Sequence, residues 1–380
     1  MIGEEIIKIA AWTAGASLAL AIALFIVKVT HWRLIRSAGV RRARYTGAIG
    51  EILARGIIPR ASVAGWAKDP VFEDVLLEYI AIAAGEERAN LEELVRHLDI
   101  RTILVNSLRN PRRASKRLRA AGYLADLADH GQEWALIEAL EDPIPEIRIQ
   151  AVRGLATLRC ERAIPKLVDM LTHEEPWYAA RIADQLVEFG SAATPALVAY
   201  AEQVDDPAGR ELAVRVIGSI GDRSASPTLI DLVGGADPGL RLAAVSALGR
   251  SGTLEAVPIL ITSLTDDDWR VRARAAASLG PFSDPHSIPR LAAALRDPSW
   301  WVRQNAAEAL VEIPGGHEAL IAAVAGDDPY ARDSALLQLA LSGEIEDARV
   351  RIESDKGTER DRRLIEAVDG KPDRPSRKAS

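Results

Sequence analysis

The sequence has few of the residue types from which enzymes build metal centres, disulfides and redox sites. It contains a single cysteine, Cys160, and therefore no intramolecular disulfide. Its six histidines stand singly along the chain, without the short spacings that place two imidazoles on one metal ion. The GxxxxGK[ST] loop that cradles nucleoside phosphates is missing as well. We therefore predict no catalytic residue, no metal and no cofactor.

An excess of positive charge is also missing, which argues against nucleic acid as a partner. The net charge of the chain is −7, although residues 28–44 contribute six cations and no carboxylate. The remainder of the chain is acidic and would repel a polyanion on average. We expect no nucleic-acid partner.

Long apolar runs are scarce, with one exception near the N-terminus. Residues 9–27 form a stretch of 19 residues without a charge. As a helix this stretch would reach about 28 Å, close to the roughly 30 Å hydrocarbon thickness of a bilayer. It follows Glu4 and Glu5 rather than the basic start of a signal peptide. We therefore predict one uncleaved transmembrane helix that contacts the lipid bilayer through residues 9–27.

The cations that follow this run predict its orientation. Positive residues stay on the cytoplasmic side of a membrane. The predicted location is the cell (inner) membrane, with the N-terminus outside and the remainder of the chain in the cytoplasm. The cations either set this orientation alone or also attract anionic lipid headgroups, at about 1 kcal/mol per cation near the surface. The predicted membrane-surface residues are Lys28, Arg33, Arg36, Arg41, Arg42 and Arg44.

The dominant pattern in the rest of the chain is a 31-residue repeat marked by arginine. The grid positions, called nodes below, are Arg117, Arg148, Ala179, Arg210, Arg241, Arg272 and Arg303, with alanine at one node only. An aliphatic residue follows each node seven positions later: Leu124, Leu155, Leu186, Ile217, Leu248, Leu279 and Leu310. A compressed last unit contains Arg332 and Leu339. A fixed period of this length indicates stacked supersecondary units that bury their apolar faces against one another.

Each unit has the pattern of two antiparallel helices. In the unit around Arg303, apolar residues recur at the spacing of one helix face. A second segment begins with proline, which suits a first helical turn because its missing N–H is not needed there. These prolines are Pro165, Pro195, Pro227, Pro258 and Pro289. The predicted fold is all-α: an α-solenoid of about eight two-helix repeats preceded by one transmembrane helix.

The pattern divides the chain into five segments. The predicted boundaries are residues 1–28 for the N-terminal stub and transmembrane helix, 29–69 for a basic juxtamembrane segment, 70–110 for a helical capping region, 111–350 for the solenoid, and 351–380 for a charged, mostly disordered tail. The last segment contains one candidate short helix, near Leu364. A solenoid presents a long surface rather than a pocket, so we expect no small-molecule substrate.

The repeats resemble a known family. Asp237-Pro238, Ala243-Ala244, Ala247-Leu248-Gly249 and Val271-Arg272 match the short bacterial HEAT repeats first named for phycobilisome lyases. The resemblance runs from roughly residue 108 to 345. It implies a scaffold that holds other proteins and, for a membrane-anchored chain, an accessory of an envelope or polysaccharide assembly system. The alternative that it implies is an enzyme or enzyme subunit of the bilin-lyase type, acting on a tetrapyrrole or a protein.

Aromatic residues make up only 5% of the chain, yet several precede the nodes by one to three positions. These are Trp177, Tyr178, Trp269, Trp300, Trp301 and Tyr330. Such rings either fold over the end of the preceding repeat or form a contact surface, because tryptophan and tyrosine are enriched at binding hot spots. We predict a protein-binding site at Trp269, Trp300, Trp301 and Tyr330, with a membrane-associated protein as the partner.

The node arginines lie near recurring aspartates. These aspartates are Asp206, Asp237, Asp297 and Asp328. The recurrence predicts a structural ladder of ion pairs between neighbouring repeats rather than a basic binding stripe.

Overall fold

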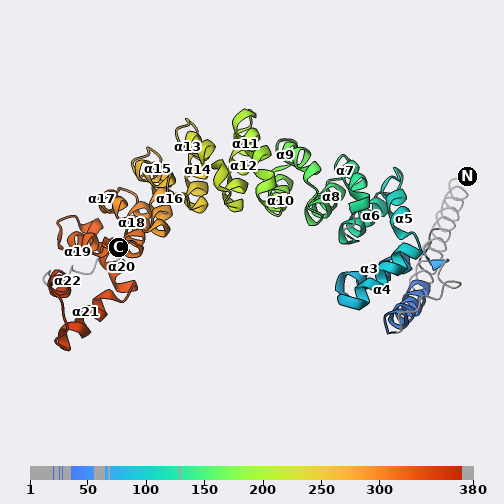
Figure 1. Cartoon of the computed structure of the whole chain (residues 1–380), viewed down its shortest axis with the longest axis horizontal. Coiled ribbons are helices and arrows are strands. Elements are labelled where there is room, and N and C mark those ends of the chain that lie inside the picture. Colours follow the sequence, from blue (N-terminus) through green and yellow to red (C-terminus); the bar gives the residue numbers. More distant parts are fainter. Residues whose placement is uncertain are drawn as a thin grey trace, which may run out of the picture. The chain divides into compact units, whose positions relative to one another are not determined.

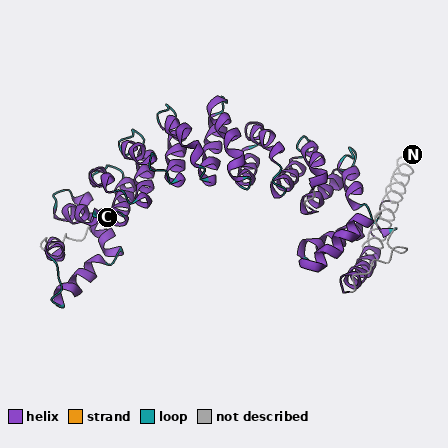
Figure 2. Ribbon diagram, in the orientation of Figure 1, coloured by secondary structure: helices purple, strands orange, loops and turns teal. Residues whose placement is uncertain are grey.

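The computed structural model is helical throughout its described part. It describes residues 20, 25, 28, 36–54, 65–66, 69–127 and 130–369. Figure 2 shows only helices and loops among these residues, which confirms the predicted all-α class. The chain divides into two compact units, Met1–Leu158 and Arg159–Ser380, which we describe separately.

The first unit begins with a helix at residues 36–54 and continues through six further helices. Their bounds are α3 (Pro70–Ile82), α4 (Gly85–His97), α5 (Ile100–Leu108), α6 (Ala114–Leu127), α7 (Glu133–Ala139) and α8 (Pro145–Thr157). The predicted capping region at 70–110 is thus helical. The nodes Arg117 and Arg148 lie in the first turns of α6 and α8, which pack against each other.

An aromatic cluster fixes residues 36–54 against the start of α3. The ring centroids of Tyr45, Trp66 and Phe72 lie 5.3–5.5 Å apart, and the Tyr45 hydroxyl donates to Asp69 at 2.9 Å. Two of the predicted membrane-surface cations also belong to this packing. Arg41 pairs with Asp69 at 3.4 Å and Arg42 pairs with Glu78.

The second unit contains two rows of helices that alternate along the chain (Figure 1). The A row consists of α10 (Pro176–Val187), α12 (Pro207–Ile220), α14 (Pro238–Ser251), α16 (Trp269–Leu279), α18 (Trp300–Glu312) and α20 (Pro329–Leu341). The B row consists of α9 (Ile164–His173), α11 (Thr194–Gln203), α13 (Ser226–Val233), α15 (Ala256–Ser263), α17 (Ile288–Ala294) and α19 (Gly316–Ala325). Each A helix packs on the next A helix and on the B helix that precedes it. This arrangement confirms the two-helix repeat.

The repeat pattern translates directly into this packing. The aliphatic residue seven positions after each node is buried, from Leu124 to Leu339. Four of the predicted prolines occupy the first turns of α9, α11, α13 and α17. Pro258 also lies in a first turn, as the third residue of α15, which begins at Ala256. Short 3-10 turns precede several B helices, among them η3 (Glu161–Ala163), η4 (Gly190–Ala193), η5 (Arg223–Ala225) and η7 (Pro285–Ser287).

The C-terminal end of the described part consists of two helices. Residues 344–353 form α21 (Glu344–Glu353), and α22 (Glu359–Asp369) folds back onto α19. The buried carboxylate of Asp361 holds this turn together, because it accepts hydrogen bonds from Arg351 at 2.7 Å and from the Thr358 backbone at 2.8 Å. The helix expected near Leu364 corresponds to α22, while residues 370–380 lie outside the described part.

The predicted transmembrane helix falls almost entirely outside the described residues. Within 9–27 only Leu20 and Phe25 are described. None of the helices in the described part combines the length and apolar character that a membrane span requires. The anchor therefore remains a prediction from sequence.

Candidate protein-binding edge

A ladder of arginine and aspartate side chains joins neighbouring repeats. Arg272 of α16 donates from Nε and Nη2 to the carboxylate of Asp297, at 2.7 and 3.0 Å. Its Nη1 donates to the backbone carbonyls of Asp266 and Asp267, at 2.8 and 3.1 Å. One guanidinium thus binds the loop before its own helix and the loop that leads into the next A helix.

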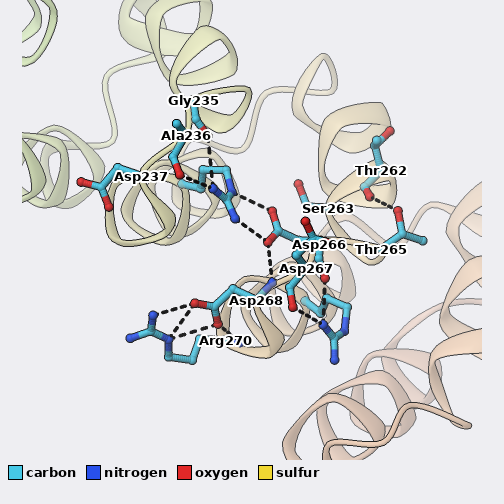
Figure 3. A network of polar contacts seen from close by, with 12 residues as sticks. Gly235, Ala236, Asp237, Thr262, Ser263, Thr265, Asp266, Asp267, Asp268 and Arg270 are labelled. Carbon is cyan, nitrogen blue, oxygen red and sulfur yellow. Dashed lines mark hydrogen bonds and ion pairs between the residues drawn. The ribbon is translucent and has the colours of Figure 1, made fainter.

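The same geometry recurs at two other nodes. Arg241 donates to Asp266 and to the carbonyls of Gly235 and Ala236, and Figure 3 shows these two loops joined by the polar network. In the first unit Arg117 donates to Asp142 at 2.7 Å. Each of these arginines therefore bonds the aspartate 25 residues later, and that aspartate lies six residues before the next node.

The ladder carboxylates stabilise the ionised form of the arginines that they bind. The hydrogen bond from Arg272 to Asp297 raises the pKa of the guanidinium, and Asp266 does the same for Arg241. Burial alone would raise the pKa of Asp266. Hydrogen bonds from Arg241 and from the Asp268 backbone outweigh this effect and hold that pKa below its ordinary value.

The ladder exists, but most of its predicted partners were wrong. Asp297 is a ladder carboxylate. Asp237 and Asp328 instead cap helices, since they accept from the backbone N–H groups of Gly239 and Tyr330. Asp206 accepts from the Tyr200 hydroxyl at 3.4 Å. An aspartate four residues before the node sits at the helix N-cap, where its side chain satisfies the free N–H groups of the first turn.

The four predicted contact residues lie at the N-terminal ends of three consecutive A helices, and we call them the aromatic edge. Trp269 and Trp300 are the first residues of α16 and α18, and Tyr330 is the second residue of α20. Between 44% and 63% of each side chain in the aromatic edge is exposed. The rings do not fold over the end of the preceding repeat to the extent that would bury them.

Two ring contacts organise the aromatic edge. Trp300 and Trp301 meet edge to face with centroids 4.7 Å apart. The guanidinium carbon of Arg303 lies 4.9 Å from the centroid of the Tyr330 ring, in cation–π geometry. Trp177, on α10, is also exposed, whereas its neighbour Tyr178 is buried.

The sequence analysis missed an apolar stripe that continues from Tyr330. Leu337 and Leu341 follow it along α20 and are 43% and 70% exposed. The corresponding positions of α18, five and nine residues after the node, carry Glu308 and Glu312. The sequence could have indicated this stripe, because α20 has leucines at the repeat positions where α18 has glutamates.

The comparisons with known proteins identify the repeats. A family model for HEAT repeats matches residues 102–188, 133–208, 194–280 and 259–341. The matches together cover more than half of the chain. The chain belongs to the HEAT repeat family. Its two-row architecture is the solenoid that stacked repeats of this size form.

Individual relatives of this HEAT repeat protein match it in part. The phycocyanobilin lyase subunit beta of Pseudanabaena tenuis (strain PCC 7409) is 35% identical over 96 residues, which are 25% of this chain and 34% of that protein. This chain thus spans about a third of that relative's length. The structure of the CpcE–CpcF complex of phycocyanin lyase from Nostoc sp. PCC7120 gives 26% identity and a TM-score of 0.35, over 39% of this chain and 98% of that one. The structure of Kap95p binding to RanGDP gives 14% identity and a TM-score of 0.48, over 81% of this chain and 46% of that one.

Proposed function

We propose that this HEAT repeat protein is a membrane-anchored docking scaffold that binds another protein through the aromatic edge. The observation that carries the proposal is the exposure of Trp269, Trp300, Trp301 and Tyr330 at matching positions of consecutive repeats. Large rigid rings with a polar atom provide much contact area for little loss of side-chain entropy, which is why they dominate binding hot spots.

The ladder supports this role because it fixes the repeats that carry the rings. Arg272 joins the loop before Trp269 to the loop before Trp300. Trp269, Trp300 and Trp301 therefore start from helix ends whose positions are set by charge-assisted hydrogen bonds. A surface held in place before binding loses less entropy when the partner docks.

The anchor is proposed from sequence alone. An uncharged run at residues 9–27 followed by six cations places the N-terminus outside and the solenoid in the cytoplasm. A partner at the same membrane would then meet the aromatic edge at a raised effective concentration, so modest contacts would suffice. Protease added to sealed right-side-out cells should leave the solenoid intact. Its digestion there would refute this topology.

Proximity labelling in the native cell tests the docking role. The full-length chain carries a labelling enzyme, and the double variant Trp300→Ala, Trp301→Ala is compared with the unaltered protein. We expect at least about a tenfold loss of the strongest labelled partner, because removing two hot-spot rings costs several kcal/mol. The matched control is Trp177→Ala, which removes an equally exposed tryptophan outside the aromatic edge. Equal labelling by all three proteins would refute the aromatic edge as the contact site.

A second candidate function follows from the local identity of 35% to a phycocyanobilin lyase subunit. In that case the chain would handle a tetrapyrrole, with the B-row surface as its cleft. We favour the non-enzymatic scaffold. Mixing purified protein with phycocyanobilin and recording the visible spectrum separates the two functions: a saturable spectral shift would support the lyase type, and an unchanged spectrum would support the scaffold.

A further inference from the structure

Arg303 differs from the ladder arginines Arg117, Arg241 and Arg272, because no aspartate binds it among the described residues and its Nε is buried without a partner. Arg303 donates from Nη1 to the carbonyls of Asp297 and Pro298, at 2.7 and 3.0 Å, as Arg272 does at its own loop. The Arg303 side chain is only 7% exposed, and its Nε has no hydrogen-bond partner among the described residues. The face of the guanidinium that binds aspartate at three other nodes therefore binds none here.

The residue at the carboxylate position is a glycine, and the loop before α20 is also shorter than the loops before α16 and α18. The next node, Arg332, follows Arg303 by 29 residues instead of 31. Arg332 donates to the carbonyl of Gly326 at 2.6 Å, so Gly326 is the structural equivalent of the ladder residues Asp266 and Asp297. A glycine cannot supply a carboxylate.

The nearest acidic residues do not replace the missing group. Asp328 is committed to the N-terminus of α20, where it accepts from the backbone N–H groups of Tyr330 and Ala331, both at 2.9 Å. The group that covers Arg303 is the ring of Tyr330, which belongs to the aromatic edge and is 63% exposed. An exposed ring with few packing contacts can move aside at low cost.

We infer that Arg303 is a carboxylate-binding site for the partner protein, which supplies an aspartate or glutamate side chain to complete the ladder. This inference rests on the proposed docking role of the aromatic edge. The carboxylate would accept from Nε and Nη2 of Arg303, the pair of atoms that bind Asp297 at Arg272. The guanidinium presents these two N–H donors side by side, and a planar carboxylate with two oxygens matches them better than a single point charge does.

The acidic loops nearby do not prevent such binding. Asp266 is followed directly by Asp267 and Asp268 in sequence and still binds Arg241 as a carboxylate with a lowered pKa. The chain itself thus contains the proposed arrangement, with an anion held by a node arginine beside two other carboxylates. At Arg303 the anion would come from the partner and would lie beside the ring of Tyr330, so it would place one charged residue next to the aromatic edge.

The capacity of the site can be tested without knowing the partner. Sodium acetate, which reproduces an aspartate side chain, is titrated into the full-length protein in detergent micelles against sodium chloride of equal ionic strength. The readout is the ¹⁵Nε–Hε resonance of Arg303, assigned by its loss in Arg303→Lys. We expect a saturable shift in the unaltered protein. In Gly326→Asp the shift should be absent, because the new side chain occupies the site. No saturable shift, or the same shift in both proteins, would overturn the inference.

The role of the site in docking is tested by the labelling assay. Gly326→Asp leaves every ring of the aromatic edge in place, and we expect it to reduce labelling of the partner about tenfold. Gly235→Asp is the matched control, since it adds one aspartate six residues before Arg241, where Nε of Arg210 already donates to Ala201 at 2.6 Å. The two new Cβ atoms meet similar space, with nearest carbonyl oxygens at 3.3 and 3.2 Å.

The outcomes separate this inference from the docking role itself. If the tryptophan double variant loses labelling while Gly326→Asp retains it, the aromatic edge binds the partner and the carboxylate site is refuted. If Gly326→Asp and Gly235→Asp lose labelling equally, the effect belongs to added charge and the inference also fails. Loss with Gly326→Asp alone supports it.

Discussion

Removing one ladder arginine should destabilise the second unit far more than removing its exposed neighbour. In Arg272→Ala, four hydrogen bonds disappear and the carboxylate of Asp297 loses its cation. The side chains of this ion pair are only 15% and 9% exposed. Breaking a buried pair costs about 3–5 kcal/mol, and partial exposure places this case near 3 kcal/mol. With a urea dependence of about 2 kcal/mol per molar, the unfolding midpoint should fall by roughly 1.5 M.

The measurement is urea unfolding of the full-length protein, followed by circular dichroism at 222 nm. Arg270→Ala is the control, because Arg270 pairs with Asp268 at the surface and its side chain is 51% exposed. It should leave the midpoint unchanged within error. A double variant, Arg272→Met with Asp297→Asn, should recover much of the loss, since no unpaired charge then remains. Equal midpoints for Arg272→Ala and Arg270→Ala would refute the structural role of the ladder.

Three further outcomes are expected. Gly218→Ala should cost about 1–3 kcal/mol in the same assay, because its Cβ would lie 2.7 Å from the Ala247 backbone on the neighbouring helix; Gly47→Ala, with open space around it, should not destabilise. Burial lowers the pKa of His317, an effect that Arg360 reinforces and Glu344 opposes. The unfolded chain therefore binds a proton at this histidine more readily than the folded protein, and the free energy of unfolding should fall as pH drops through about 6.5. A His317→Gln variant whose stability depends on pH as steeply as that of the unaltered protein would contradict this. The Trp300→Ala, Trp301→Ala protein should keep its urea midpoint, and a large drop would mean that the rings belong to the core.

The secondary structure and core of this protein follow from local pattern. The node spacing, the proline in the first turn of most B helices and the aliphatic residue seven positions after each node are all readable in one dimension. These features predicted the structure correctly because each repeat contacts only its neighbours, so the period of the sequence is also the period of the packing. The residues of the aromatic edge were identified from the same pattern, because each stands two or three positions before a node.

Contacts between repeats required the tertiary structure. Asp237 and Asp266 both precede nodes by a few residues, yet one caps its own helix and the other crosses to the arginine of the preceding repeat. The distance of an aspartate from its node does not separate these two roles. Which aspartate a guanidinium can contact depends on how two neighbouring helix pairs stack. The same limit applies to α22: its sequence predicted a short helix within a charged tail, whereas its packing on α19 and the burial of Asp361 and Leu364 required the tertiary structure.

The sequence by itself determined that identical helix pairs stack, since only stacking buries their apolar faces. Which node arginine has its carboxylate was decided only in three dimensions. Gly326 occupies the position at which an aspartate stands in three other repeats, and among the described residues the buried Nε of Arg303, beneath the Tyr330 ring, has no acceptor.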